Sequence, residues 1–199
     1  MIGRLSGTLI AKQPPFLLLD VGGIGYEVEA PMSTFFKLPA IGSAVVLQTH
    51  LVIREDAHLL FGFATAQEKA LFREVIKITG IGPKLALAIL SGIGVDDFWA
   101  AVRAAETGRL VKLPGIGKKT AERIVIELRD KAGAGGPGDI GTLTSSGVTI
   151  AASPLAEARA ALESLGYKPV EAQKLTDAVH KPEMSTDQII REALKRAVR

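Results

Sequence analysis

The sequence predicts a multi-domain α+β protein with an N-terminal β-barrel, an all-α domain, a flexible linker and a C-terminal bundle of three helices. Two observations carry this prediction. Apolar positions recur every second residue before Thr65 and at helical spacing after it. Residues 133–153 contain six Gly, one Pro and a single charged residue, a composition that buries too little apolar surface to offset its ordering entropy. The 199 residues therefore divide into ranges 1–63, 64–132, 133–153 and 154–199.

The first range is predicted to consist of five short strands. Gly- and Pro-rich breaks separate the apolar or alternating runs, which cover residues 2–10, 16–21, 26–29, 45–53 and 58–63. Five short strands in about 60 residues fit a small barrel of the OB type. Another small antiparallel barrel fits the pattern nearly as well. Within residues 51–63, the run Arg54-Glu55-Asp56-Ala57 interrupts two strands and predicts a hairpin with a charged tip.

The second range is predicted to be entirely helical. Thr65 and Glu68 have the spacing of a capping box, and the apolar residues behind them recur at helical intervals. Further helices are expected over residues 83–91, 96–105, 107–111 and 118–131. Phe72, Phe98 and Trp99 lie on these amphipathic helices, so we expect them in the core rather than in a base-stacking site.

An internal repeat lies inside this helical range. Residues 78–86 and 113–121 align 35 positions apart, each with a Gly-Ile-Gly turn, Lys in the first turn of the next helix, and Ala behind it. The glycines let the backbone turn tightly, and the N-terminus of the following helix offers unpaired N–H groups that suit a phosphate oxygen. Lysine side chains would add counter-charge, so the repeat predicts binding of a nucleic-acid backbone without reading base identity.

The charge distribution supports this interpretation over a simple helix–helix turn. The whole chain has a net charge of +3, whereas residues 64–132 alone hold twelve basic and eight acidic residues. A P-loop is excluded because Lys112 stands where its first Gly should be, and neither repeat has the third Gly of a dinucleotide site. With no Cys and only three His, no metal site, thiol nucleophile or cofactor is expected. No apolar run reaches membrane-spanning length, and no signal peptide is recognised, which indicates a soluble cytoplasmic protein.

The last range predicts three short helices. Ser153-Pro154 has the pattern of an N-cap followed by a first-turn proline, and Ser185 with Gln188 forms another capping box. Between them, residues 155–165 and 169–179 are expected to be helical, and Gly166 ends the first of these helices.

With these motifs, the chain resembles the RuvA family of bacterial Holliday-junction branch-migration subunits over its whole length. The most specific stretches are residues 51–63, 78–91 and 113–131. The resemblance implies an OB-like barrel, a tandem helix–hairpin–helix domain and a mobile three-helix domain. It also implies a homotetramer that holds four-way junction DNA, with one or two tetramers per junction. The motor RuvB would be its partner, and the resolving nuclease RuvC would act on the same junction.

Three groups of functional residues follow from the resemblance, and none of them is catalytic. The phosphate-binding positions are Gly80, Gly82, Lys84, Gly115, Gly117, Lys118, Lys119 and Arg123. Glu55 and Asp56 would form an acidic pin at the junction centre, where negative charge repels phosphate and steers strands. The motor-binding candidates are whichever parts of Leu162, Leu165, Tyr167 and Ile189 stay exposed once the bundle has formed its own core.

Two other functions are weighed against this scaffold. A glycosylase or lyase built on helix–hairpin–helix elements would need a catalytic Lys or Asp facing a base pocket. Residues 124–131 instead run directly into the linker. A single-strand binder using the barrel would need stacking aromatics, and aromatic residues make up only 5% of the chain.

Overall fold

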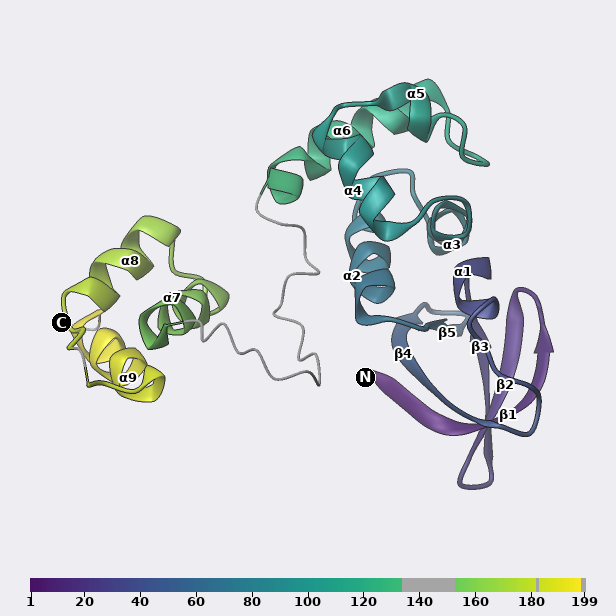
Figure 1. The fold of residues 1–199 in the computed structure, drawn as a ribbon, viewed down its shortest axis with the longest axis horizontal. Coiled ribbons are helices and arrows are strands. Elements are labelled where there is room, and N and C mark those ends of the chain that lie inside the picture. Colours follow the sequence, from purple (N-terminus) through teal and green to yellow (C-terminus); the bar gives the residue numbers. More distant parts are fainter. Residues whose placement is uncertain (134–152, 182, 198–199) are drawn as a thin grey trace. The chain divides into compact units, whose positions relative to one another are not determined.

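The computed structural model describes residues 1–133, 153–181 and 183–197, which form two separate units (Figure 1). The predicted linker, residues 133–153, lies outside the described residues except for its two ends. Gly133 ends the last helix of the first unit, and Ser153 caps the first helix of the second unit. No single helix in the described ranges is long and apolar enough to cross a membrane.

The N-terminal part is a closed five-stranded barrel. Its strands are β1 (Arg4–Gln13), β2 (Phe16–Val21), β3 (Ile24–Glu29), β4 (Ala44–Ile53) and β5 (His58–Phe63). They are ordered β1-β2-β3-β5-β4, and all neighbours pair antiparallel except β3 and β5. The long β1 closes the barrel because its first half pairs with β4 and its second half with β2, with a register shift between Leu9 and Ala11. The OB-like prediction is confirmed.

One element of the barrel was not predicted from the sequence. The short helix α1 (Met32–Phe35) follows β3, and its N-cap residue Pro31 provides no side-chain cap. Four residues without a capping side chain leave no periodic signal in the sequence. The Met32 N–H donates to Ser91 Oγ over 2.9 Å, so α1 ties the barrel to the helical domain.

The helical domain contains α2 (Ala66–Val75), α3 (Pro83–Gly92), α4 (Val95–Arg103), α5 (Thr107–Leu110) and α6 (Lys118–Gly133). The predicted capping box is present: Thr65 Oγ1 accepts from the Glu68 N–H at 3.2 Å, and the Thr65 N–H donates to Glu68 Oε2 at 3.1 Å. Phe72 and Phe98 are fully buried and Trp99 is nearly so, in agreement with their prediction as core residues.

The last strand of the barrel packs into the apolar core of the helical domain, while the barrel also encloses a core of its own. The rings of Phe61 and Phe63 on β5 lie 5.1 and 4.9 Å from the ring of Phe72 on α2, measured between centroids. Near the C-terminal end of α2, Glu74 accepts hydrogen bonds from Lys77 and from Lys131 of α6. Burial raises the pKa of Glu74, but the hydrogen bonds and the positive charges of Lys131 and Lys77 together lower it by more, so its pKa lies below the ordinary value. The hairpin β4–β5 and the helices are therefore parts of one packed unit.

The second unit is a bundle of α7 (Pro154–Ser164), α8 (Pro169–Asp177) and α9 (Thr186–Ala197). Both predicted caps form: Ser153 Oγ accepts from the Ala156 N–H, and Ser185 and Gln188 exchange side-chain and backbone hydrogen bonds. The core is small, with Leu162, Ala172 and Ala193 at its centre. Thr176 adds a buried hydroxyl that donates to the Ala172 carbonyl at 2.9 Å.

Candidate nucleic-acid interface

The two Gly-Ile-Gly segments have the same backbone hydrogen-bond pattern. In each, the N–H of the central Ile donates three residues back, and the second Gly carbonyl accepts from the Ala four residues on. The four bonds are Ile81 to Ile78 at 3.0 Å, Ala86 to Gly82 at 3.0 Å, Ile116 to Leu113 at 3.1 Å, and Ala121 to Gly117 at 3.0 Å. The repeat in the sequence is thus also a repeat in backbone geometry. We call residues 79–82 the first loop and residues 114–117 the second loop.

The glycines of each loop allow its backbone conformation, and the isoleucine between them is buried. Gly80 and Gly115 have φ values of 91° and 78°, a left-handed conformation that L-residues with a side chain rarely adopt. Ile81 and Ile116 are 4% and 5% exposed and anchor the loops in the core. The second glycine of each loop, Gly82 or Gly117, is exposed, so the backbone there is open to a ligand.

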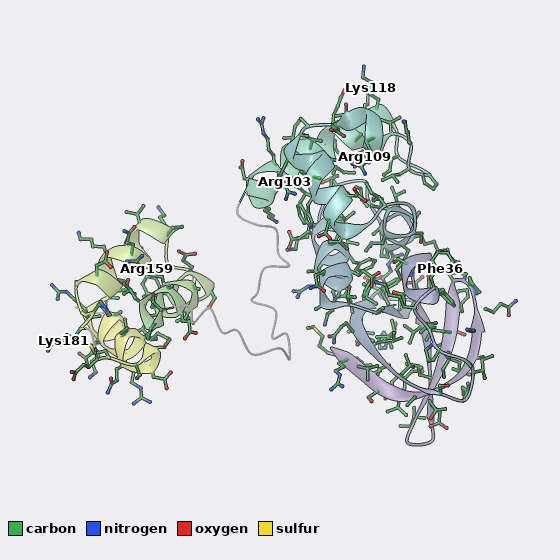
Figure 2. All side chains as sticks on the ribbon, in the orientation of Figure 1. Phe36, Arg103, Arg109, Lys118, Arg159 and Lys181 are labelled. Carbon is green, nitrogen blue, oxygen red and sulfur yellow. The ribbon has the colours of Figure 1, made fainter. Side chains whose placement is uncertain are left out.

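Each loop leads into a helix whose first N–H groups have no intrahelical partner. Such a terminus favours an anion through its unpaired donors and the helix dipole. Lys84, Lys118 and Lys119 are exposed in these first turns, and none of them takes part in an ion pair among the described residues. Figure 2 shows Lys118 at the end of the helical domain that lies away from the barrel. Apart from Arg123, which lies in the second turn of α6, the predicted phosphate positions therefore lie in two exposed loops and the basic first turns of the helices that follow.

The two loops are not equivalent as anion sites. Pro83 is the first residue of α3 and has no N–H, whereas Lys118 opens α6 with both an N–H and an ammonium group. The second loop therefore offers one more backbone donor and one more positive charge than the first.

The loops also touch each other's helices. The Arg123 guanidinium Nη1 of α6 donates to the Thr79 carbonyl of the first loop at 2.7 Å. In the other direction, a Cβ on Gly115 would lie 2.8 Å from Leu85 Cδ1 of α3, so the backbone of the second loop lies close against α3. Sequence reasoning placed Arg123 among the phosphate contacts and missed its contact with Thr79, which no local pattern can reveal.

Glu55 and Asp56 lie at the tip of the β4–β5 hairpin, as the sequence predicts, and we call this pair the acidic tip. Strands β4 and β5 pair up to Ile53 and His58, and the Arg54 N–H donates to the Ala57 carbonyl at 2.8 Å to close the turn. Glu55 and Asp56 are both exposed at this turn. No group of three His, Asp or Glu side chains in the described ranges could hold a metal ion.

Comparison with known proteins gives matches along the whole described chain. Three family models match: the RuvA N terminal domain over residues 1–62, a SAM-like helix-hairpin-helix tandem over 72–130, and the RuvA C-terminal domain over 153–198. The chain is 53% identical, over 204 residues and 100% of both chains, to the "Holliday junction branch migration complex subunit RuvA" of Vibrio vulnificus strain YJ016. This chain belongs to the RuvA family. Relatives of the same name from Pseudomonas syringae pv. syringae and Vibrio cholerae (strain M66-2) are 53% and 50% identical over 98% and 100% of each chain.

The C-terminal domain of this RuvA-family chain corrects part of the predicted motor-binding group. Leu162 and Ile189 are completely buried and are therefore not accessible to a partner. Leu162 belongs to the small core between the three helices. Tyr167 is partly buried against the same core, and Leu165 is 61% exposed. Val170, which sequence reasoning did not single out, is 79% exposed in the first turn of α8. Leu165 and Val170 flank the turn between α7 and α8.

Proposed function

We propose that the chain is the junction-binding, non-catalytic subunit of a Holliday junction branch migration complex. It binds the phosphate backbone of four-way DNA irrespective of the base sequence. The ATP-driven motor RuvB moves the branch point. In this role it acts in recombination and repair in the cytoplasm, and the nuclease RuvC works on the same junction. The relatives described above are named as subunits of such a complex.

One observation carries the proposal: two loops with the same backbone hydrogen-bond pattern present exposed lysines at the starts of two helices. Backbone N–H groups and ammonium groups bind phosphate oxygens wherever they occur along a strand, so they supply affinity without base specificity. Four copies of the chain would place eight such loops around an open junction, and one or two tetramers would hold each junction.

The acidic tip gives the proposed scaffold its preference for a branch point. Glu55 and Asp56 are exposed at the tip of the β4–β5 hairpin, and their carboxylates repel phosphate. At the centre of a four-way junction the strands part, so the tip meets less phosphate there than on a continuous duplex. The loops therefore supply affinity for DNA, and the acidic tip disfavours binding of a continuous duplex.

The C-terminal bundle is the proposed contact with the motor. Among the candidates, Leu165 is exposed and Tyr167 is only partly buried, and Val170 in the first turn of α8 is exposed as well. An exposed apolar group of this kind, outside a small core, fits an interface with another protein.

A binding panel tests the proposed function. The full chain is titrated against a four-way junction, a linear duplex and a single strand of matched sequence, and strand nicking is assayed in the same samples. We expect the junction to bind most tightly, with no nicking and no base removal. Equal affinity for all three DNAs would contradict the proposal, and nicking or base release would favour a helix–hairpin–helix repair enzyme instead.

A further inference from the structure

Arg123 lies on the helix of the second loop but is bonded to the first loop. Its Nη1 donates to the Thr79 carbonyl at 2.7 Å, across 44 residues of sequence. A Cβ on the neighbouring Gly80 would lie only 3.8 Å from the same nitrogen, so the guanidinium lies close against the loop backbone. Arg123 thus contacts the loop at the residue before its left-handed glycine.

Holding this carbonyl also orients the next N–H group. The peptide between Thr79 and Gly80 is planar, so its C=O and N–H point to opposite sides. Arg123 holds the oxygen and thereby fixes the direction of the Gly80 N–H, which donates no hydrogen bond within the part of the chain that the structure describes. A side chain of the second repeat therefore determines how a backbone donor of the first repeat is presented.

The opposite contact makes the link reciprocal. Leu85 of α3 packs its Cδ1 against Gly115 of the second loop, and Leu113 packs its Cδ2 close to Gly92 at the end of α3. Each helix thus touches the other repeat's loop or its flank. An apolar contact sets the distance between the loops, and the Arg123 hydrogen bond sets their relative orientation.

We propose that Arg123 is a positioning residue that joins the two loops into one preorganised clamp for two phosphates. This inference rests on the proposed function, in which both loops bind DNA backbone. Preorganisation lowers the ordering cost of binding, because neither loop has to be arranged when the DNA arrives. One of the five guanidinium N–H groups is used for Thr79, which leaves others for a phosphate at the first loop.

The first test compares Arg123→Met with Arg129→Met, which removes the same charge from an exposed position further along α6. NMR of the full chain without DNA follows the Gly80 backbone amide. We expect the Gly80 resonance to shift in Arg123→Met and to stay in place in Arg129→Met, with equal thermal unfolding midpoints. An unchanged Gly80 amide in Arg123→Met would overturn the proposal, and this measurement does not depend on DNA binding.

The second test is a double-mutant cycle in junction binding. We expect Arg123→Met to weaken binding roughly tenfold, as the loss of a hydrogen bond to a charged group does. Lys84→Ala on the first loop should then cost less in the Arg123→Met background than in the wild type, while Lys119→Ala should cost the same in both. Full additivity of Arg123 with Lys84 would make Arg123 an independent phosphate ligand and overturn the positioning role. A wild-type chain that fails to prefer the junction would instead contradict the proposed function.

Discussion

Lys118 and Lys119 are the side chains on which the phosphate-binding hypothesis can be tested most directly. Two loops in each of four subunits offer on the order of eight phosphate contacts, so log K should fall with log salt at a slope of about −7. Lys118→Ala with Lys119→Ala should weaken binding to all junction sequences equally and flatten this slope. Titrations at several salt concentrations measure both effects.

The matched control for that pair removes two charges from the same domain outside the loops. Arg103→Ala with Arg129→Ala changes exposed residues on α4 and α6. This control should lower the affinity less and leave the slope nearly unchanged. A loss that depends on junction sequence, or an unaltered slope in the lysine variant, would show that these lysines do not bind phosphate.

His50 predicts a pH dependence of stability at the level of one residue. Its ring lies 5.7 Å from that of Phe72, and its buried Nδ1 has no hydrogen-bond partner among the described residues. Burial lowers the pKa of His50, and the nearby charges of Arg73 and Lys69 lower it further. The unfolded chain therefore takes up a proton near pH 6.5 while the folded chain does not, so stability should fall as the pH drops below 6.5.

Trp99, the only tryptophan, reports unfolding of the unit that contains His50. Urea unfolding followed by its fluorescence at pH 7.5 and 5.5 should show a clear loss of stability at the lower pH in the wild type. His50→Gln has no titrating ring and should show a smaller loss between the same two pH values. Equal losses in both proteins would assign the pH dependence to other groups.

At the scale of single elements, the β4–β5 hairpin is predicted to separate affinity from DNA shape preference. Glu55→Gln with Asp56→Asn removes the two carboxylates at its tip and leaves both loops intact. Repulsion of a continuous duplex should then disappear, so duplex binding should rise relative to junction binding. Competition between labelled junction and unlabelled duplex measures the ratio, and a ratio that stays the same or moves toward the junction would leave the tip without this role.

Elements could be predicted from the sequence wherever a local signal marks their ends. Two capping boxes predict the starts of α2 and α9, because a capping box satisfies helix donors within one turn. They are formed by Thr65 with Glu68 and by Ser185 with Gln188. Gly80 and Gly115 predict the two loops, because only glycine easily adopts the left-handed backbone conformation found there. By contrast, α1 has no side-chain cap, and the Arg123–Thr79 contact joins residues that are distant in sequence.

The candidate site shows the same division between local and tertiary information. The exposed lysines could be identified from their spacing after the glycines, since the first turn of a helix is set locally. The burial of Leu162 and Ile189 could not, because an apolar helix face does not reveal which of its residues a small three-helix core covers. Only the packed bundle distinguishes Leu165, which stays exposed, from Leu162 one turn earlier.

At the scale of the whole molecule, the predicted flexible linker implies that DNA binding and motor binding can be separated. A Gly-rich chain of the length of residues 133–153 has a root-mean-square span of roughly 25 Å and a stretched limit of about 70 Å. Such a linker transmits position but not torque, so each unit should bind its own partner alone. The described residues before the linker include both loops, the acidic tip and the core that packs β5 against the helices.

Truncation after Gly133 tests this division, because it keeps α6 and its Lys131–Glu74 contact intact. We expect the truncated chain to bind the four-way junction within about twofold of the full chain, since no loop and no exposed lysine of the site is lost. ATP-driven branch migration with RuvB should be abolished, because nothing then holds the motor at the junction. Adding residues 153–199 as a separate chain should not restore migration, since the physical link is missing. Wild-type migration by the truncated chain, or loss of its junction binding, would show that the two activities are not divided at the linker.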